Sequence, residues 1–231
     1  GGREVFDKSK DFPLSFEVEH AYPDYSLYNI TDTAYGFLTR GCPRHCAFCI
    51  VGDKEGLVSR KVADLSEFWN GQKNIVLCDP NILACPQHED LLQQLADSKA
   101  WIDINQGLDI RLMTEEKAEM IKQMKIKNLH FAWDQYQDKE KILPKFKMFK
   151  DITGIDFRKL GVFVLCNFDT TFEQDLERIY TLRDYGFNPF VMLYNKEHIK
   201  RGSKHKLLQR WCNNRIVFYS CPSFDDFTGK K

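Results

Sequence analysis

The chain has 231 residues, of which 43% are hydrophobic and 29% are charged, a composition typical of a globular protein with one large domain or two small ones. Its 33 basic and 33 acidic residues give zero net charge, which removes any global electrostatic attraction to nucleic acid or to an anionic membrane. The sequence has no run of about 18 apolar residues and no charged-then-apolar leader, so it predicts neither a membrane span nor secretion and favours a cytoplasmic protein.

Six apolar runs are typical of β-strands, and stretches with the 3.6-residue spacing of amphipathic helices separate several of them. The predicted strands are residues 33–39, 74–78, 101–105, 127–133, 160–166 and 188–194. The predicted helices are residues 88–99, 114–124 and 171–186, of which the last two begin at threonines suited to cap a helix. Alternating strands and helices predict parallel strands joined by right-handed crossovers, and hence an α/β sheet that is either open or curled into a partial barrel.

Polar residues follow the predicted strands at the points where they end. The runs are DPN (79–81), QGLDIR (106–111), DQYQD (134–138), NFDTT (167–171) and NKEH (195–198). Because parallel α/β folds bind ligands at the carboxyl ends of their strands, these residues are the first candidates for a functional site. Strand-end position alone suggests three candidates to act on a substrate: Asp134, Tyr136 and Tyr194.

Three of the eight cysteines, Cys42, Cys46 and Cys49, form a C-x3-C-x2-C array after the first predicted strand. Three thiols this close can converge on one metal centre, whereas a chain of this size without a secretion signal gives little reason to expect disulfides. Structural zinc usually has four closed ligands, and a fourth is only weakly indicated here. A 4Fe–4S cluster held by three cysteines instead keeps one iron open to an exogenous ligand.

The sequence CPRHCAFC, residues 42–49, resembles the C-x3-C-x-aromatic-C motif of the radical S-adenosylmethionine (radical SAM) superfamily, and in particular its cobalamin-domain-associated members. The resemblance covers residues 33–220 and implies a partial (β/α)6 TIM-like barrel of the radical SAM type. It further implies that the cysteines bind a 4Fe–4S cluster, that S-adenosyl-L-methionine binds the open iron, and that an electron from a reductant protein such as flavodoxin or ferredoxin releases a 5'-deoxyadenosyl radical.

The resemblance also suggests how the rest of the chain is organised. Residues 1–32 are expected to be an N-terminal extension or a linker from an upstream cobalamin-binding domain, as the start at Gly1-Gly2-Arg3 without methionine indicates. Residues 221–231 are expected to be a C-terminal tail. Three reaction classes are compatible with the motif: cobalamin-dependent methyl transfer, methylthio transfer to tRNA, and hydrogen abstraction from a peptide or small metabolite.

Cofactor-binding residues outside the cysteines also follow from the resemblance. Phe48 is expected to lie against the adenine of S-adenosylmethionine, with Asn167 nearby. The second-strand loop, usually Gly-Gly-Glu in the family, reads Cys-Asp-Pro-Asn here and places Asp79 and Asn81 near the methionine amino group. The residues expected to bind the ribose hydroxyls and the methionine carboxylate follow the third strand and are Asn105, Gln106, Asp109 and Arg111.

Several of these residues also have a structural interpretation. Asp79 and Asn81 could cap their loop, and Asp109 could pair with Arg111 across a turn. The cysteine array could staple a non-catalytic binding module through zinc or a cluster, or belong to a degenerate radical SAM protein, because the second-strand loop departs from the commonest form. The basic segment 196–215 is expected to be a solvated helix face, with a phosphate or nucleic-acid contact as the alternative.

Overall fold

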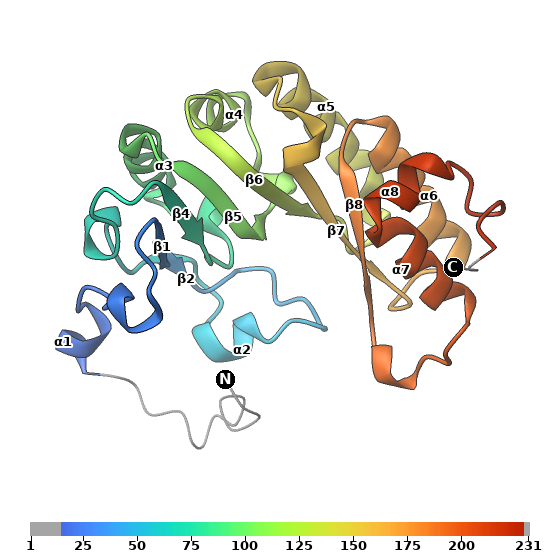
Figure 1. Ribbon diagram of the computed structural model, residues 1–231, viewed down its shortest axis with the longest axis horizontal. Helices are drawn as coiled ribbons and strands as arrows, with labels where there is room; N and C mark the ends of the chain where they lie inside the picture. The colour runs from blue at the N-terminus through green and yellow to red at the C-terminus, as the bar shows by residue number, and fades with distance from the viewer. Residues whose placement is uncertain (1–14, 229–231) are drawn as a thin grey trace.

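The centre of the fold is a six-stranded parallel β-sheet, seen in the computed structural model, which describes residues 15–228 (Figure 1). The strands lie side by side in chain order: β1 (Thr33–Gly36), β4 (Asn74–Leu77), β5 (Trp101–Leu108), β6 (Lys125–Ala132), β7 (Leu160–Cys166) and β8 (Asn188–Leu193). Every neighbouring pair is parallel. The six predicted strands and the α/β class are therefore confirmed, with two differences in length. The first strand ends at Gly36 rather than at residue 39, because Thr39 belongs to a separate two-stranded sheet, and β5 continues beyond its predicted end at residue 105.

Helices connect most of these strands. The three predicted ones are α3 (His88–Ser98), α4 (Glu115–Lys122) and α6 (Phe172–Asp184). Thr114 caps α4 and Thr171 caps α6, because each hydroxyl accepts a backbone hydrogen bond at 3.3 Å from the third residue of its helix. The sequence pattern does not predict α5 (Lys139–Thr153), because Pro144 lies inside this helix.

The hydrophobic core lies between the sheet and the helices. Phe131 on β6 packs edge-to-face against Phe146 and Phe149 of α5, with ring centroids 5.5 and 5.1 Å apart. In Figure 1, α3, α4 and α5 lie above the sheet and α2 (Val51–Glu55) lies below it. We call the face of the sheet that turns away from α3, α4 and α5 the inner face. It keeps exposed side chains such as Phe190 and Met192. This face and the strand ends are therefore free to form sites.

Side chains cover both edges of the sheet. On the β1 edge, the Tyr25 hydroxyl accepts a hydrogen bond from the Tyr35 N–H at 3.0 Å. On the β8 edge, the Asn213 amide accepts from the Val191 N–H at 2.7 Å and donates to the Val191 carbonyl at 3.0 Å. Paired edges of this kind oppose sheet-to-sheet association.

Asn213 ends α7 (Lys204–Asn213), which α8 (Arg215–Ser220) follows. Within the basic segment 196–215, α7 buries Leu208, Trp211 and Cys212, so this segment is only partly the solvated face that the sequence predicts.

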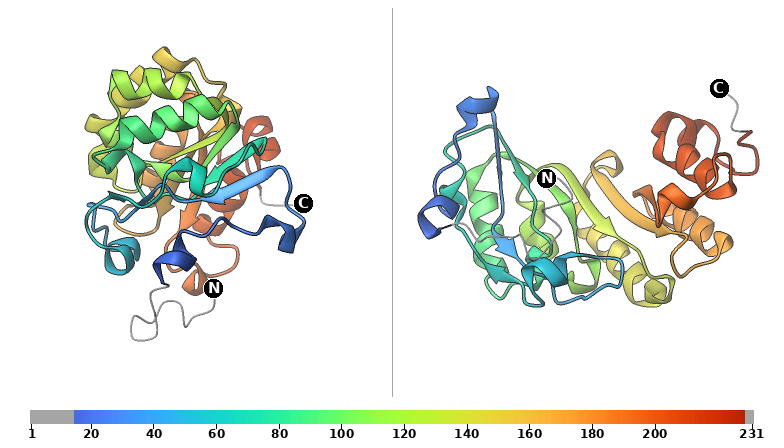
Figure 2. Two further views of the ribbon diagram at one scale, coloured as in Figure 1. Left: turned by 90° about the vertical axis from the view of Figure 1, so that its left-hand side faces the viewer. Right: turned by 90° about the horizontal axis from the view of Figure 1, so that it is seen from below.

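Short elements complete the described chain: α1 (Phe16–Glu19), and an antiparallel pair of β2 (Thr39–Arg40) and β3 (Arg60–Lys61). Figures 1 and 2 place α1 toward one end of the long axis and α7 and α8 toward the other.

Of the predicted N-terminal extension and C-terminal tail, residues 1–14 and 229–231 lie outside the described residues. In residues 15–228 no helix is both long enough and apolar enough to cross a membrane.

Candidate functional site

The three cysteines lie on a loop, residues 41–50, between β2 and α2. Gly41 begins this cysteine loop with a φ of 85°, and a Cβ there would lie 2.2 Å from the Val58 carbonyl oxygen, so only glycine fits. Glu55, the last residue of α2, accepts hydrogen bonds from the Gly41 N–H at 3.0 Å and from Arg40 Nη1 at 2.9 Å. These contacts close the loop at its base.

The three thiols differ in their surroundings. Cys42 and Cys46 are half-buried, and Cys49 is exposed. Burial raises the pKa of the Cys46 thiol above its usual value, while the nearby Arg111 works against this rise. Among the described residues, no three His, Cys, Asp or Glu side chains are grouped closely enough to hold a metal ion. Three thiols on one loop nevertheless have the ligand chemistry of iron–sulfur and zinc centres, and they would have to converge further to bind one.

A chain of ion pairs ties the cysteine loop to the ends of β5 and β6. Arg44 in the array donates from Nε to the Asp109 carboxylate at 2.5 Å. Asp109 also accepts from Nε of Arg111 at 2.8 Å, and Arg111 donates from Nη1 to Asp138 at 2.9 Å. Burial acts to raise the pKa of Asp109, but Arg111 and Arg44 outweigh it and hold that pKa below its usual range. The predicted pair of Asp109 with Arg111 is thus present. It is part of a longer chain of ion pairs that reaches Arg44 in the cysteine loop and Asp138 after β6.

A cavity of about 630 Å³ opens beside Cys46 at these strand ends. Its lining comes from the cysteine loop, the segments after β5 and β6, and α5: Arg44, Cys46, Arg111, Gln135, Asp138, Lys141 and Lys145. Four of these side chains are cationic and one is acidic, so the cavity favours a ligand that carries an anionic group.

Phe48 connects the cysteine loop to the ends of β7 and β8. Its ring centroid is 5.3 Å from that of Phe168, which follows β7. The Phe168 ring is in turn 4.8 Å from that of Tyr194, which follows β8. Phe48 and Cys46 also line one small cavity together with Asp134. The aromatic residue of the array therefore faces the strand ends.

Asp79 is buried and holds the connection between β1 and β2. Its carboxylate accepts hydrogen bonds from the Leu38 N–H at 3.1 Å, the Thr39 N–H at 2.5 Å and the Thr39 hydroxyl at 2.7 Å. Burial raises the pKa of Asp79 to about 6 in spite of these donors. Its side chain thus stabilises the loop, and contact with a cofactor stays a prediction.

Asn81 lies beside the first cysteine of the array. Its side-chain Nδ2 donates to the Cys42 sulfur at 3.5 Å, and its backbone carbonyl accepts from the Ser59 hydroxyl at 2.9 Å. Its Oδ1 is buried and has no hydrogen-bond partner within residues 15–228. Since a buried unpaired acceptor costs about 1–3 kcal/mol, this oxygen suits a ligand that brings a donor such as an amino group.

The other predicted site residues lie farther along the sheet. Asn105 and Gln106 are exposed and belong to an irregular stretch of β5. Asn105 lines a second cavity, one with no lining residue in common with the cavity beside Cys46. Asn167 has a φ of 63° and donates from Nδ2 to the Tyr194 carbonyl at 3.4 Å, so it joins the ends of β7 and β8.

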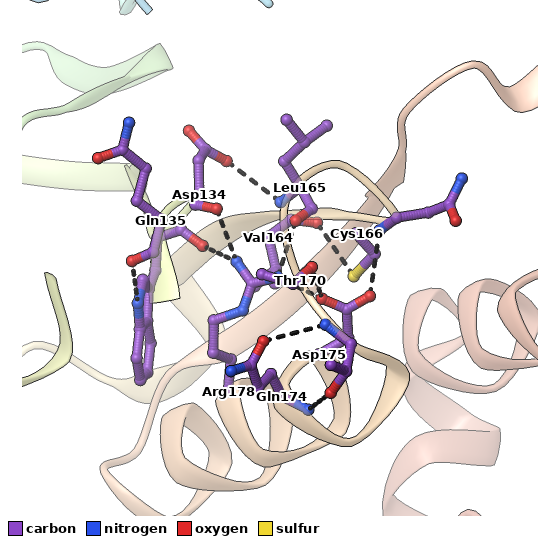
Figure 3. A network of polar contacts seen from close by, with 12 residues as sticks. Asp134, Gln135, Val164, Leu165, Cys166, Thr170, Gln174, Asp175 and Arg178 are labelled. Carbon is purple, nitrogen blue, oxygen red and sulfur yellow. Dashed lines mark hydrogen bonds and ion pairs between the residues drawn. The ribbon is translucent and has the colours of Figure 1, made fainter. Parts of the chain in front are cut away.

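A buried ion pair holds the ends of β6 and β7 together (Figure 3). Arg178 on α6 points among the strand-end carbonyls and donates to those of Trp133 at 2.6 Å and Leu165 at 2.8 Å. Its partner Asp175 lies 2.5 Å away, and both side chains are fully buried. The Asp134 carboxylate accepts from the Leu165 N–H at 3.1 Å, and burial raises its pKa. The rim that carries Asp134 is therefore rigidly supported.

Two residues that line the cavity beside Cys46, Gln135 and Asp138, belong to the polar run 134–138 and are predicted as part of that run. Three further lining residues, Arg44, Lys141 and Lys145, are not predicted from the sequence, although Arg44 stands inside the cysteine array. The two lysines lie on α5, which the sequence pattern does not predict.

Compared with known proteins, the sequence matches no family model and no curated relative. The functional assignment therefore rests on the cysteine array, the parallel sheet and the contacts that join them.

Proposed function

We propose that this chain is the core of a radical SAM enzyme, with Cys42, Cys46 and Cys49 as the ligands of a 4Fe–4S cluster. The observation that carries the proposal is the position of the array. A C-x3-C-x-aromatic-C loop follows the first strand of a six-stranded parallel sheet, and Arg44 and Phe48 of this loop contact residues that follow β5 and β7. The finer architecture, a partial (β/α)6 barrel, is part of the same proposal.

Each contact of the site has a role in this proposal. When bound, the cluster and S-adenosylmethionine supply one-electron cleavage to a 5'-deoxyadenosyl radical. Arg111 and the cationic lining of the large cavity bind the methionine carboxylate, and the unpaired Oδ1 of Asn81 accepts from its amino group. Phe48 packs against the adenine and keeps water from the small cavity that it lines with Cys46 and Asp134.

The setting follows from the chemistry. A reducing compartment such as the cytoplasm keeps the thiols available as ligands, and a flavodoxin or ferredoxin is the class of protein that delivers the electron. A cobalamin-binding domain remains the partner expected for the subclass that the motif resembles most.

The test is anaerobic reconstitution with iron and sulfide, followed by incubation with dithionite and S-adenosylmethionine and measurement of 5'-deoxyadenosine. We expect a brown protein that forms 5'-deoxyadenosine, and loss of both cluster and product in Cys46→Ser. Cys221→Ser is the matched control, because Cys221 lies outside the loop and is half-buried like Cys46. A colourless protein that retains zinc would contradict the proposal and favour the binding module. A brown protein without product would favour the degenerate alternative.

A further inference from the structure

We propose that the inner face of the sheet carries a second ligand site, one that takes a planar heteroaromatic ring of the nucleobase class. The site is formed by Asn105, His130, Phe163 and Phe190, which line a cavity of about 190 Å³ over β5 to β8. It shares no lining residue with the cavity beside Cys46. Ligand binding here needs neither cluster nor S-adenosylmethionine, so the inference goes beyond the proposed function and can stand or fall without it.

Aromatic side chains form one wall of this inner-face cavity. The rings of His130 and Phe163 are nearly parallel, with an interplanar angle of 9° and centroids 5.1 Å apart. The Phe190 ring stands edge-to-face to Phe163 at 6.0 Å and remains 46% exposed. A half-exposed aromatic ring in a concave site is typical of a ligand-binding surface, because solvent contact with it is unfavourable until a ligand covers it.

The position of the His130 ring depends on a glycine of the next strand. A Cβ on Gly161 would lie 2.6 Å from His130 Cδ2, so a side chain there would push the ring out of its stack. His130 Nδ1 lies 3.0 Å from the Ile104 carbonyl oxygen, which can only accept, so Nδ1 carries the hydrogen. In the neutral ring Nε2 is then a hydrogen-bond acceptor on the cavity wall.

A bulge in β5 supplies the second polar group. Ile104 pairs with Leu129 and Leu108 with Phe131, so β5 has two more residues than β6 over this stretch. Asn105 lies within the bulge, and its exposed amide offers a donor and an acceptor side by side. Bulges redirect side chains and occur often beside binding sites, which is consistent with Asn105 facing this cavity.

These features together select the ligand class. Flat aromatic walls bind flat rings by stacking, and such stacking tolerates any nucleobase because every base has a π-face. An asparagine amide pairs with the hydrogen-bonding edge of a base, because both present a donor next to an acceptor. A purely hydrocarbon ring would leave Asn105 and His130 Nε2 unpaired, so the site favours a heteroaromatic ring.

The test is a calorimetric titration of the purified protein with adenosine, guanosine, cytidine and uridine in turn, with the histidine ring signals followed by NMR. We expect saturable binding of at least one nucleoside and a shift of the His130 ring signals. Phe190→Ser and Asn105→Ala should each raise the Kd about tenfold, in line with the loss of one stacking or pairing contact. Met192→Ser is the matched control, since Met192 is also 46% exposed and lies two residues farther along the same strand and face.

Two results would overturn the inference. One is the absence of saturable binding by all four nucleosides. The other is binding that survives in Phe190→Ser and Asn105→Ala but is lost in Phe48→Ser. That result would place the nucleoside in the small cavity lined by Phe48 and Cys46 and leave the proposed function intact. Thermal melting of each variant shows whether it is folded. If Phe190→Ser does not fold, Asn105→Ala still tests the inference, because Asn105 is an exposed polar residue.

Discussion

Arg44, in the middle of the cysteine array, and Asp109, just after β5, are joined by a hydrogen bond of 2.5 Å although 65 positions separate them in the sequence. The Asp109 side chain is 6% exposed and also binds Arg111, so its carboxylate is held from two sides. This buried carboxylate thus helps to hold the cysteine loop over the strand ends, together with the contacts of Glu55 at the base of the loop.

Replacing this carboxylate should loosen the cysteine loop. Asp109→Asn keeps the side-chain shape but removes the charge, and a hydrogen bond between charged groups contributes about 1.5–3 kcal/mol. We therefore expect amide hydrogen exchange of residues 41–56 to become about tenfold faster, while α3 is unchanged. Glu119→Gln, which breaks an exposed pair with Lys122, is the control. Unchanged exchange in Asp109→Asn would show that Arg44 does not hold the loop.

The raised pKa of Asp79 predicts a pH-dependent part of the stability. With a pKa of about 6 when folded and about 3.9 when unfolded, Asp79 keeps its proton longer in the folded state. Its contribution to the free energy of unfolding is therefore fully present below about pH 4 and is lost as the pH rises through about 6. Asp79→Asn removes this titration.

Urea unfolding of wild type and Asp79→Asn between about pH 4 and about pH 7 measures this difference. The wild-type free energy of unfolding should fall relative to that of the variant as the pH rises, by about 1.4 kcal/mol for each unit that separates the two pKa values. A difference that is constant with pH would mean that the Leu38 and Thr39 donors stabilise the charged carboxylate fully.

Removal of the buried arginine should be among the most damaging single changes. Arg178→Leu leaves the buried Asp175 charge without its cationic partner and removes the arginine donor from the strand-end carbonyls, and breaking a buried pair costs about 3–5 kcal/mol. Equilibrium urea unfolding measures the loss. Arg158→Leu is the control, because Arg158 is 74% exposed in its pair with Asp156 and should cost far less. Equal losses in the two variants would contradict a special role for Arg178.

The covered edge of β8 predicts a change in association. Asn213→Leu removes the acceptor of the Val191 N–H, at a cost of about 1–3 kcal/mol, and exposes a strand edge, while the Val191 carbonyl keeps its hydrogen bond from Gln209 Nε2 at 3.1 Å. We expect a lower Tm and concentration-dependent self-association in light scattering. Gln93→Leu, an exposed amide on α3, should change neither. If the variant melts lower but stays monodisperse, the hydrogen bonds of Asn213 stabilise the fold, and its role in preventing association through the strand edge is contradicted.

The sequence by itself determined the order and type of most elements, because apolar periodicity and helix caps are local properties. Six strands and three helices could be predicted in this way, with Thr114 and Thr171 as helix starts. The spacing of Cys42, Cys46 and Cys49 is local as well, and so is the polar character of the residues after each strand. The helix α5 could not be predicted, since Pro144 obscures a pattern that packing against Phe131 supports.

Only the tertiary structure decided which polar residues meet. Nothing near Asp109 in the sequence indicates that Arg44 is its partner, and nothing near Asp79 indicates that its carboxylate turns toward Thr39. Asn105 lines a cavity different from that of Arg111, and it belongs to an irregular stretch of β5 between Ile104 and Leu108. The physical reason is that a side chain's partners are set by which strand ends lie side by side and by the register between strands, and both are properties of the packed sheet.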